Sequence, residues 1–345
     1  MKNIMEGNKN MSSELYSKAN KALNAKGLYH FLNFNNLPTL PGLGGAGMGL
    51  TYYRNINELS KYNIKAKLIN ENFEPNLSTN FLGLNFPMPI LPSPMSGIET
   101  NLSHLISEYE FIDKLFSGCV KFGTLGLCGD SNDSTNNYIV PDLIKKYGGI
   151  ATCKPRKNDI ILDKIAILQK SDVSAIGIDL DGLGGVKLFQ SNSVCLKSRK
   201  DLREIRKKIK CKAFLKGVTS LEDAMMAYEL GYDGIIISNH GGRSVDYLPS
   251  TLECLHEISP KLSGKISIGV DGGVLSGYDA FIYLANGADM VFAGRAFLNA
   301  VIANGSDGVE SLLNQFYTEL KKIMMFTNCK EIGDIDESKI VKRNN

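Results

Sequence analysis

The stretch LEDAMMAYELGYDGIIISNHGGR, residues 221–243, contains one complete structural unit of this chain. Its first ten residues have the apolar spacing of an amphipathic helix. Gly231 is a typical helix stop, and residues 234–238 form an apolar run that we expect to be a buried strand. The run ends at Ser238-Asn-His-Gly-Gly-Arg243. Imidazole accepts a proton near neutral pH and guanidinium binds a carboxylate through paired hydrogen bonds, so this turn predicts a functional site at the carboxyl end of a strand.

The same unit recurs along the chain. Gly287-Ala-Asp-Met290 resembles Gly231-Tyr-Asp-Gly234, and each is a helix stop that leads into a strand. We expect strands at residues 89–94, 124–128, 149–154, 175–180, 213–217, 234–238, 266–270 and 290–293. Eight strands that alternate with helices over about 240 residues predict a (β/α)8 barrel, or TIM barrel, in the α/β class. A doubly wound sheet is the alternative, but no Gly-x-Gly-x-x-Gly follows the first strand.

The pattern divides the chain into three parts. Residues 1–80 are an N-terminal helical and glycine-rich extension, residues 81–330 form the barrel, and residues 331–345 are a polar C-terminal tail. The extension contains Leu40-Pro-Gly-Leu-Gly-Gly-Ala-Gly-Met-Gly49, which is too flexible for the interior of a helix or strand. This segment is either a linker or a loop that packs over the mouth of the barrel.

Composition excludes several function classes. The chain has 345 residues and a net charge of only +3, which gives no electrostatic case for a nucleic-acid partner. No stretch approaches the roughly 20 apolar residues of a membrane span, and the polar first ten residues have no apolar core for a signal peptide. The seven cysteines show no metal-like spacing and several lie in apolar runs, so we expect no metal site and a cytoplasmic protein.

Charged residues gather where the expected strands end, and in a barrel these ends share one face. Charges at such positions need partners, so we expect the group to satisfy its members and a polar ligand together. The group consists of Lys154, Arg156, Asp179, Asp181, Lys216, His240, Arg243, Asp271 and Arg295.

The last two strand ends predict a phosphate site. Asp271-Gly-Gly273 and Gly294-Arg295 combine glycines, whose backbone N–H groups can approach an anion, with a cation. The helix after the eighth strand would point its N-terminus at the same place. A phosphorylated cofactor is therefore expected, with Lys216 and His240 at its reactive part.

These motifs together resemble the FMN-dependent α-hydroxy-acid oxidases and dehydrogenases, a family that includes glycolate oxidase and lactate oxidase. The resemblance covers roughly residues 80–330. It is nearest to a bacterial branch of α-hydroxy-acid-oxidising proteins, with shared motifs Pro41-Gly-Leu-Gly-Gly45, Cys128-Gly-Asp130, Lys154-Pro-Arg156 and Asp179-Leu-Asp181. The family forms homo-oligomers, either tetramers or octamers, and the resemblance implies one here.

The resemblance also implies roles for individual residues. His240 would take the proton of a small L-2-hydroxy acid, Arg243 would bind its carboxylate, and Asp181 would hold the imidazolium. Lys216 would stabilise negative charge on the reduced flavin, and Asp271 would bind the ribityl chain. The remaining implied FMN-binding residues are Ser93, Pro94, Met95, Gly129, Lys154, Asp179, Ser238, Gly272, Gly273, Gly294 and Arg295.

Some positions depart from the family's pattern. Arg156 occupies the place of a tyrosine that bonds the substrate hydroxyl, and Lys154 and Asp179 replace a glutamine and a threonine. Residues 182–187 contain no counterpart of a second carboxylate-binding arginine, so Arg156 is the candidate replacement. Gly129 replaces a serine and Leu275 a phosphate-binding arginine, while Tyr52 and Tyr53 are candidates for a substrate tyrosine.

Three other functions are compatible with the strand-end residues. A flavin-using isomerase, similar to the type 2 isopentenyl-diphosphate isomerases, would have a related fold. A Schiff-base enzyme would use Lys216 and leave the Ser238–Arg243 turn without a role. A non-catalytic flavin-binding protein would explain the altered positions. A lactate-like oxidation with FMN is the function that we expect first.

Overall fold

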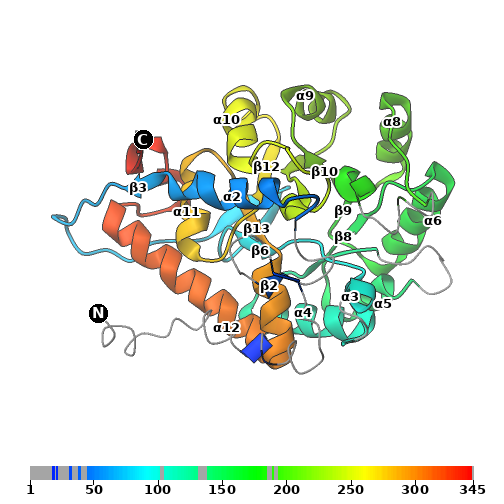
Figure 1. Ribbon diagram of the computed structural model, residues 1–345, viewed down its shortest axis with the longest axis horizontal. Helices are drawn as coiled ribbons and strands as arrows, with labels where there is room; N and C mark the ends of the chain where they lie inside the picture. Colours follow the sequence, from blue (N-terminus) through cyan, green and yellow to red (C-terminus); the bar gives the residue numbers. More distant parts are fainter. Residues whose placement is uncertain are drawn as a thin grey trace.

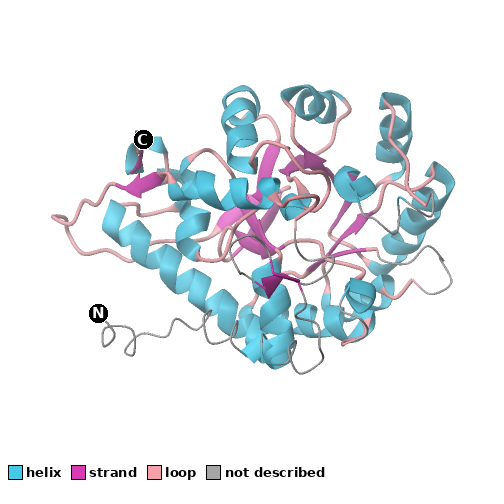
Figure 2. Ribbon diagram, viewed as in Figure 1, coloured by secondary structure: helices cyan, strands magenta, loops and turns pink. Residues whose placement is uncertain are grey.

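Eight parallel strands at the centre of the molecule are arranged as a barrel with helices around it (Figures 1 and 2). Their order in the sheet is β6-β13-β12-β11-β10-β9-β8-β7. They are β6 (Ile90–Pro92), β7 (Leu127–Gly129), β8 (Ile150–Cys153), β9 (Ala175–Asp179), β10 (Lys212–Val218), β11 (Gly234–Ile237), β12 (Ser267–Asp271) and β13 (Met290–Ala293).

The barrel closes between its first two strands. β6 pairs with β13, and an isolated parallel bridge joins Met95, just after β6, to Cys128 of β7. The backbone N–H of Gly129 donates to the carbonyl of Met95 at this bridge. The predicted (β/α)8 barrel is confirmed, and each of the eight expected strands overlaps an observed one.

This computed structural model describes residues 18–19, 21, 31–32, 38–39, 45–101, 105–130, 138–184, 189 and 193–343. Helices cover the outside of the barrel because their apolar faces bury against the strands. They are α4 (Glu108–Phe122), α5 (Val140–Tyr147), α6 (Asn158–Leu168), α8 (Arg199–Lys208), α9 (Leu221–Glu229), α10 (Thr251–Leu262), α11 (Gly277–Ala285) and α12 (Arg295–Thr327).

A second apolar cluster fills the barrel interior. The antiparallel hairpin of β4 (Thr79–Phe81) and β5 (Leu84–Phe86) contributes Phe81, which packs edge-on against Phe292 of β13. Phe214 occupies the space beside Gly177, where a Cβ atom would lie 2.3 Å from its ring. The hairpin and these aromatic rings close the barrel interior, which leaves the carboxyl ends of the strands as the place for a site.

Chain segments from both termini pack on the barrel. β3 (Tyr62–Ile64) pairs with β14 (Ile340–Lys342). The expected polar tail therefore contains two short 3₁₀ helices, Ile332–Asp334 and Glu337–Lys339, followed by this strand. Further short elements are β1 (Phe31–Leu32), β2 (Pro38–Thr39), α2 (Leu50–Ser60) and α3 (Ile98–Asn101). Among the described residues no helix is long and apolar enough to cross a bilayer.

The glycine-rich segment is described from Gly45 onward, and residues 40–44 lie outside the described part, as do the first seventeen. Ala46 donates its N–H to the carbonyl of Gly242, and Met48 and Thr51 donate theirs to the carboxylate of Asp246. A Cβ atom on Gly47 would lie 2.9 Å from that carboxylate, which explains the glycine. The described half of the segment is therefore a loop packed on the barrel mouth.

Candidate active site

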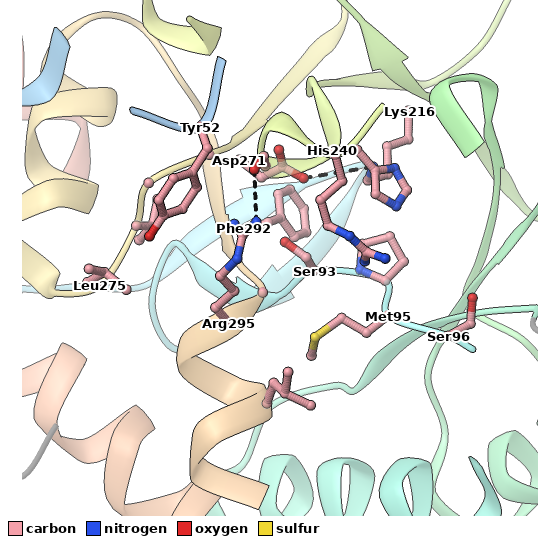
Figure 3. A pocket seen from close by; sticks show the side chains of 18 of the residues that line it. Tyr52, Ser93, Met95, Ser96, Lys216, His240, Asp271, Leu275, Phe292 and Arg295 are labelled. Carbon is pink, nitrogen blue, oxygen red and sulfur yellow. Dashed lines mark hydrogen bonds and ion pairs between the residues drawn. The ribbon is translucent and has the colours of Figure 1, made fainter. Parts of the chain in front are cut away.

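A cavity opens at the carboxyl ends of the strands (Figure 3). It encloses about 890 Å³ of space outside the protein atoms, counting its open mouth, which suits a small molecule or a cofactor. The predicted residues that line it are Ser93, Pro94, Met95, Lys154, Lys216, His240, Arg243, Asp271, Gly272, Gly273, Gly294 and Arg295.

Lys216 lies at the centre of a buried ionic network behind this cavity. Its Nζ lies 3.0 Å from Oδ1 of Asp179, 3.3 Å from Oδ1 of Asp181 and 3.9 Å from Oδ2 of Asp271. Burial alone would lower the pKa of Lys216, but the three carboxylates outweigh it and raise the pKa above its usual value. Lys216 is therefore a permanent cation facing the cavity.

A local irregularity of β10 positions this lysine. The pairing of β10 with β11 shifts register between Lys216 and Val218, and Gly217 between them has φ 88°. A Cβ atom at Gly217 would lie 2.6 Å from the Asp181 carboxylate carbon. Only glycine fits this close approach, so the bulge lets Asp181 reach the network.

Asp179, at the end of β9, is fully buried between two lysines. Its Oδ2 lies 2.5 Å from Nζ of Lys154, while its Oδ1 binds Lys216. Burial works to raise the pKa of Asp179, but the two lysines hold it well below its usual range. Asp179 therefore stays ionised and links the ends of β8, β9 and β10.

His240 begins the turn after β11 and faces the cavity. Its Nδ1 lies 3.1 Å from Oδ1 of Asp181, and its backbone N–H donates to Oγ of Ser238. Burial lowers the pKa of His240 from 6.5, opposed by the nearby Asp181 carboxylate. The imidazole is thus a neutral base near pH 7, with an anion placed to stabilise it once protonated.

The cation expected to bind a carboxylate is available. Among the described residues, no carboxylate lies within ion-pairing distance of the Arg243 guanidinium. Burial, together with the neighbouring charge of Arg295, lowers the pKa of Arg243 to about 10. An arginine in this situation gains by binding an anion from solution.

The cavity wall formed after β12 and β13 fits a phosphorylated, hydroxyl-bearing group. Helix α12 begins at Arg295, and this N-terminus and Gly294 line the cavity. Oδ1 of Asp271 is buried there with no hydrogen-bond partner among the described residues. Burial raises the pKa of Asp271 to about 6, against the pull of Lys216. A buried acceptor without a donor is costly, and the ribityl hydroxyls of FMN would supply one.

Five predicted residues do not line the cavity. Asp179, Asp181 and Ser238 stand behind Lys216 and His240 as their hydrogen-bond partners. Gly129 lies in the barrel wall, where a Cβ atom would approach Oγ of Ser96 to 2.7 Å.

The fifth, Arg156, faces away from the cavity. It is 1% exposed, and its Nε lies 3.3 Å from Oδ2 of Asp130 in a buried cluster with Lys164. Side chains two apart on an extended chain share a side, but β8 ends before Lys154 and Pro155 redirects the chain. In this structure Arg156 does not reach a substrate in the cavity. Residues 185–187, where a second arginine was sought, lie outside the described residues.

Sequence reasoning missed several lining residues, most of them apolar. Tyr52, one of two candidates, does line the cavity, with Arg295 stacked 4.6 Å from its ring centroid. Tyr53 does not line it. Residues without a chemical signature were not predicted because only the tertiary fold brings them there: Ile56, Ser96, Ile98, Val274, Phe292 and Leu298.

Comparisons with known proteins point the same way. Residues 186–342 match the family described as FMN-dependent dehydrogenase. An L-lactate oxidase of Lactobacillus jensenii is 38% identical over 165 residues, 48% of this chain and 40% of that protein. Oxidase FUB9 of Gibberella fujikuroi (strain CBS 195.34 / IMI 58289 / NRRL A-6831) is 29% identical over 308 residues, 85% of this chain and 86% of that protein.

Two further comparisons agree. The peroxisomal (S)-2-hydroxyacid oxidase GLO3 of Arabidopsis thaliana is 37% identical over 161 residues, 46% of this chain and 44% of that protein. The matched segments thus span less than half of GLO3 and of the lactate oxidase. A crystal structure of mandelate oxidase superposes with a TM-score of 0.79 over 97% of this chain and 99% of that one, at 20% identity. At this low identity, the similarity to mandelate oxidase shows only that the two proteins share a fold.

Proposed function

We propose that this chain is a member of the FMN-dependent α-hydroxy-acid oxidase family, which its similarity to FMN-dependent dehydrogenases and hydroxy-acid oxidases supports, and that it binds FMN and oxidises a small L-2-hydroxy acid, such as lactate, to the 2-oxo acid. One observation carries this proposal above all. A neutral histidine bonded to a carboxylate lies beside an arginine that has no acidic partner among the described residues, in a cavity that also offers groups suited to a phosphorylated cofactor.

Each charged or titratable residue of the site has a separate role in the proposed reaction. The Arg243 guanidinium binds the substrate carboxylate and orients the hydroxyl-bearing carbon. Nδ1 of His240 is engaged by Asp181, which leaves Nε2 to take the hydroxyl proton. Asp181 then stabilises the imidazolium, and Lys216 offers positive charge to the acceptor. FMN, when bound, supplies the acceptor for the hydride that leaves the substrate carbon.

Other residues of the cavity would hold FMN. Gly272, Gly273, Gly294 and Arg295 would bind its phosphate, and Asp271 its ribityl chain. Ser93, Pro94 and Met95, which follow β6, line the cavity between these groups and Lys216, where the ring would lie. Lys154 completes the ring-facing wall with Lys216, and Ser238 holds Lys216 from behind as the acceptor of a 3.0 Å hydrogen bond from its Nζ. Arg156 keeps no direct role in this proposal, because it is buried against Asp130.

The experiment is anaerobic mixing of the purified, FMN-loaded protein with glycolate, L-lactate and (S)-mandelate, followed by flavin absorbance. We expect at least one acid to bleach the flavin and to yield its 2-oxo acid. A flavin spectrum that no 2-hydroxy acid bleaches would indicate a non-catalytic binding protein. A protein that takes up no FMN would refute the proposal entirely.

The isomerase and Schiff-base alternatives have less support. The related proteins named above are oxidases and dehydrogenases of hydroxy acids, which favours oxidation over isomerisation. Lys216 is held as a cation by three carboxylates, whereas a Schiff-base lysine must be neutral to react. Borohydride trapping of a carbonyl compound on Lys216 would reverse this judgement.

We also propose a cytoplasmic, homo-oligomeric protein. All the cysteines are free thiols, which suits a reducing compartment, although two of the Arabidopsis relatives are named as peroxisomal. Light scattering of the purified protein tests the oligomer, and a monomer at micromolar concentration would contradict it.

A further inference from the structure

Two lysines, not one, face the proposed flavin ring. Lys154 and Lys216 both line the cavity, and their side chains are 9% and 2% exposed. Asp179 lies between them and does not line the cavity itself. Its two oxygens are divided, Oδ2 to Lys154 at 2.5 Å and Oδ1 to Lys216 at 3.0 Å. The cavity wall therefore presents two ammonium groups with their shared counter-ion behind them.

Lys154 is held both at its backbone and at the tip of its side chain. Its backbone N–H donates to Oδ1 of the fully buried Asp130 at 2.6 Å, and its Nζ is held by Asp179. Gly182 leaves room for the stem between these points, because a Cβ atom there would lie 2.8 Å from Cδ of Lys154. A long side chain held in this way keeps its charge at one place in the wall.

The positive charge of Lys154 in the cavity wall would affect how easily the flavin ring is reduced. Two electrons and one proton convert the neutral oxidised ring into an anion, so the product carries one negative charge more than the reactant. A fixed cation in a buried wall stabilises that product, and its effect is stronger than in water because the site is poorly screened. The Asp179 carboxylate would have the opposite effect, but it lies behind the two lysines and does not line the cavity.

We propose that Lys154 is a charge-positioning residue that raises the reduction potential of bound FMN, with Asp179 as the anchor that holds it and moderates its effect. The inference rests on the proposed FMN binding. A merely structural Lys154–Asp179 pair would affect folding and FMN retention but leave the potential of the bound flavin unchanged.

The test is the reduction potential of bound FMN, measured against reference dyes in the full-length holoprotein. For Lys154→Gln we expect the equilibrium between reduced and oxidised flavin to shift at least tenfold toward the oxidised form. That shift corresponds to about 30 mV for a two-electron couple. Lys154→Arg keeps the charge and should stay close to the parent, while Asp179→Asn should shift the equilibrium the other way.

A matched control comes from the opposite end of the same barrel. Lys212, at the start of β10, pairs with Asp233 at 2.9 Å on the surface, with its side chain 45% exposed. Lys212→Gln removes the same charge from a lysine–aspartate pair far along the strand from the cavity. It should leave the potential unchanged, and an equal shift in this control would overturn the inference.

The other possible results for Lys154→Gln also test the inference. FMN bound by Lys154→Gln at the parent's potential would overturn the role of Lys154. If Lys154→Gln loses FMN, the reduction potential of Lys154→Arg is compared with that of the double variant that combines Lys154→Gln and Asp179→Asn. We expect the double variant to have the lower potential, and equal potentials in the two proteins would overturn the inference. A parent protein that binds no FMN contradicts the proposed function instead, so the two failures are distinguishable.

Discussion

At the scale of single residues, His240 lines the cavity and also has a strained backbone conformation. Its φ is 58°, and Gly241 and Gly242 follow at 60° and 81°, so three successive residues are left-handed. For a histidine this conformation costs of the order of 1 kcal/mol or more. The turn presents the imidazole to the cavity and aims its Nδ1 at Asp181.

The first prediction concerns His240→Asn. Asparagine tolerates left-handed backbone but offers no base, so we expect FMN binding and stability to persist while flavin reduction slows by about 100-fold or more. Anaerobic rapid mixing measures the rate. His256→Asn is the matched control, because His256 lies outside the cavity with Tyr62 and Asn286. Equal rates for parent and His240→Asn would remove His240 as the base.

The second prediction concerns pH. The base must be neutral to accept a proton, and burial lowers the pKa of His240 from 6.5. We therefore expect kcat/KM to rise with pH, with its inflection below the pKa of an ordinary histidine, about 6.5. Asp181→Asn removes the charge that opposes this shift, so its inflection should lie at still lower pH. An inflection well above 6.5 in the parent would contradict the assignment.

The third prediction concerns Asp271→Asn in the FMN-free protein. Folding raises the pKa of Asp271 from 3.8 to about 6, so the folded state holds this proton more tightly and stability is lost as pH rises through that interval. At 1.36 kcal/mol for each unit, the variant should gain about 3 kcal/mol over the parent between pH 4 and pH 7.

Urea unfolding at several pH values measures this gain. Asp163→Asn, at an exposed position of α6, is the control for replacing an aspartate outside the cavity. The same Asp271→Asn variant should bind FMN more weakly, since it lacks the acceptor carboxylate. A stability difference that does not change between pH 4 and pH 7 would mean that burial does not raise the pKa of Asp271.

At the scale of elements, α2 supports the turn that carries His240 through a reciprocal amide pair. Nδ2 of Asn55 donates to Oδ1 of Asn239 at 2.9 Å, and Nδ2 of Asn239 donates to Oδ1 of Asn55 at 2.8 Å. Both side chains are fully buried. Oδ1 of Asn55 also accepts the N–H of Thr251, the first residue of α10. One asparagine thus joins α2, the His240 turn and α10.

The fourth prediction follows for Asn55→Ala. It leaves buried donors without an acceptor, which should lower the free energy of unfolding by about 3 kcal/mol. Flavin reduction should slow as well, because the turn that carries His240 loses its support. Asn57→Ala, an exposed position on the same helix, should change stability by less than about 0.5 kcal/mol. Comparable losses in both variants would contradict a specific role for the amide pair.

The comparison of sequence with structure is clearest at this scale. The strands of the barrel were predictable because each is an apolar run bounded by glycine or charged residues. The amide pair was not, because Asn55 and Asn239 lie 184 residues apart and have no signature of their own. β14 was missed for a related reason, since only Ile340 of its three residues is buried and its pairing with β3 depends on the fold.

At the scale of the whole molecule, one face of the barrel gathers the site from separate strands. β8 to β13 each place a residue at or behind the cavity, and the eight-stranded order makes neighbours of Lys154, Asp179 and Lys216. This grouping was predictable once the barrel was inferred. The direction of Arg156 was not, because it depends on the buried Asp130 carboxylate, which binds Arg156 and Lys164 together away from the cavity.

We propose that a 2-hydroxy acid bound in this cavity loses a hydride to FMN while His240 takes its hydroxyl proton. Anaerobic rapid mixing of the FMN-loaded protein with a 2-hydroxy acid, and with the same acid deuterated at carbon 2, tests this reaction. We predict that the flavin is bleached with one equivalent of 2-oxo acid formed, and more slowly with the deuterated acid. A flavin left unbleached by every acid, or bleached equally fast in His240→Asn, would contradict the claim.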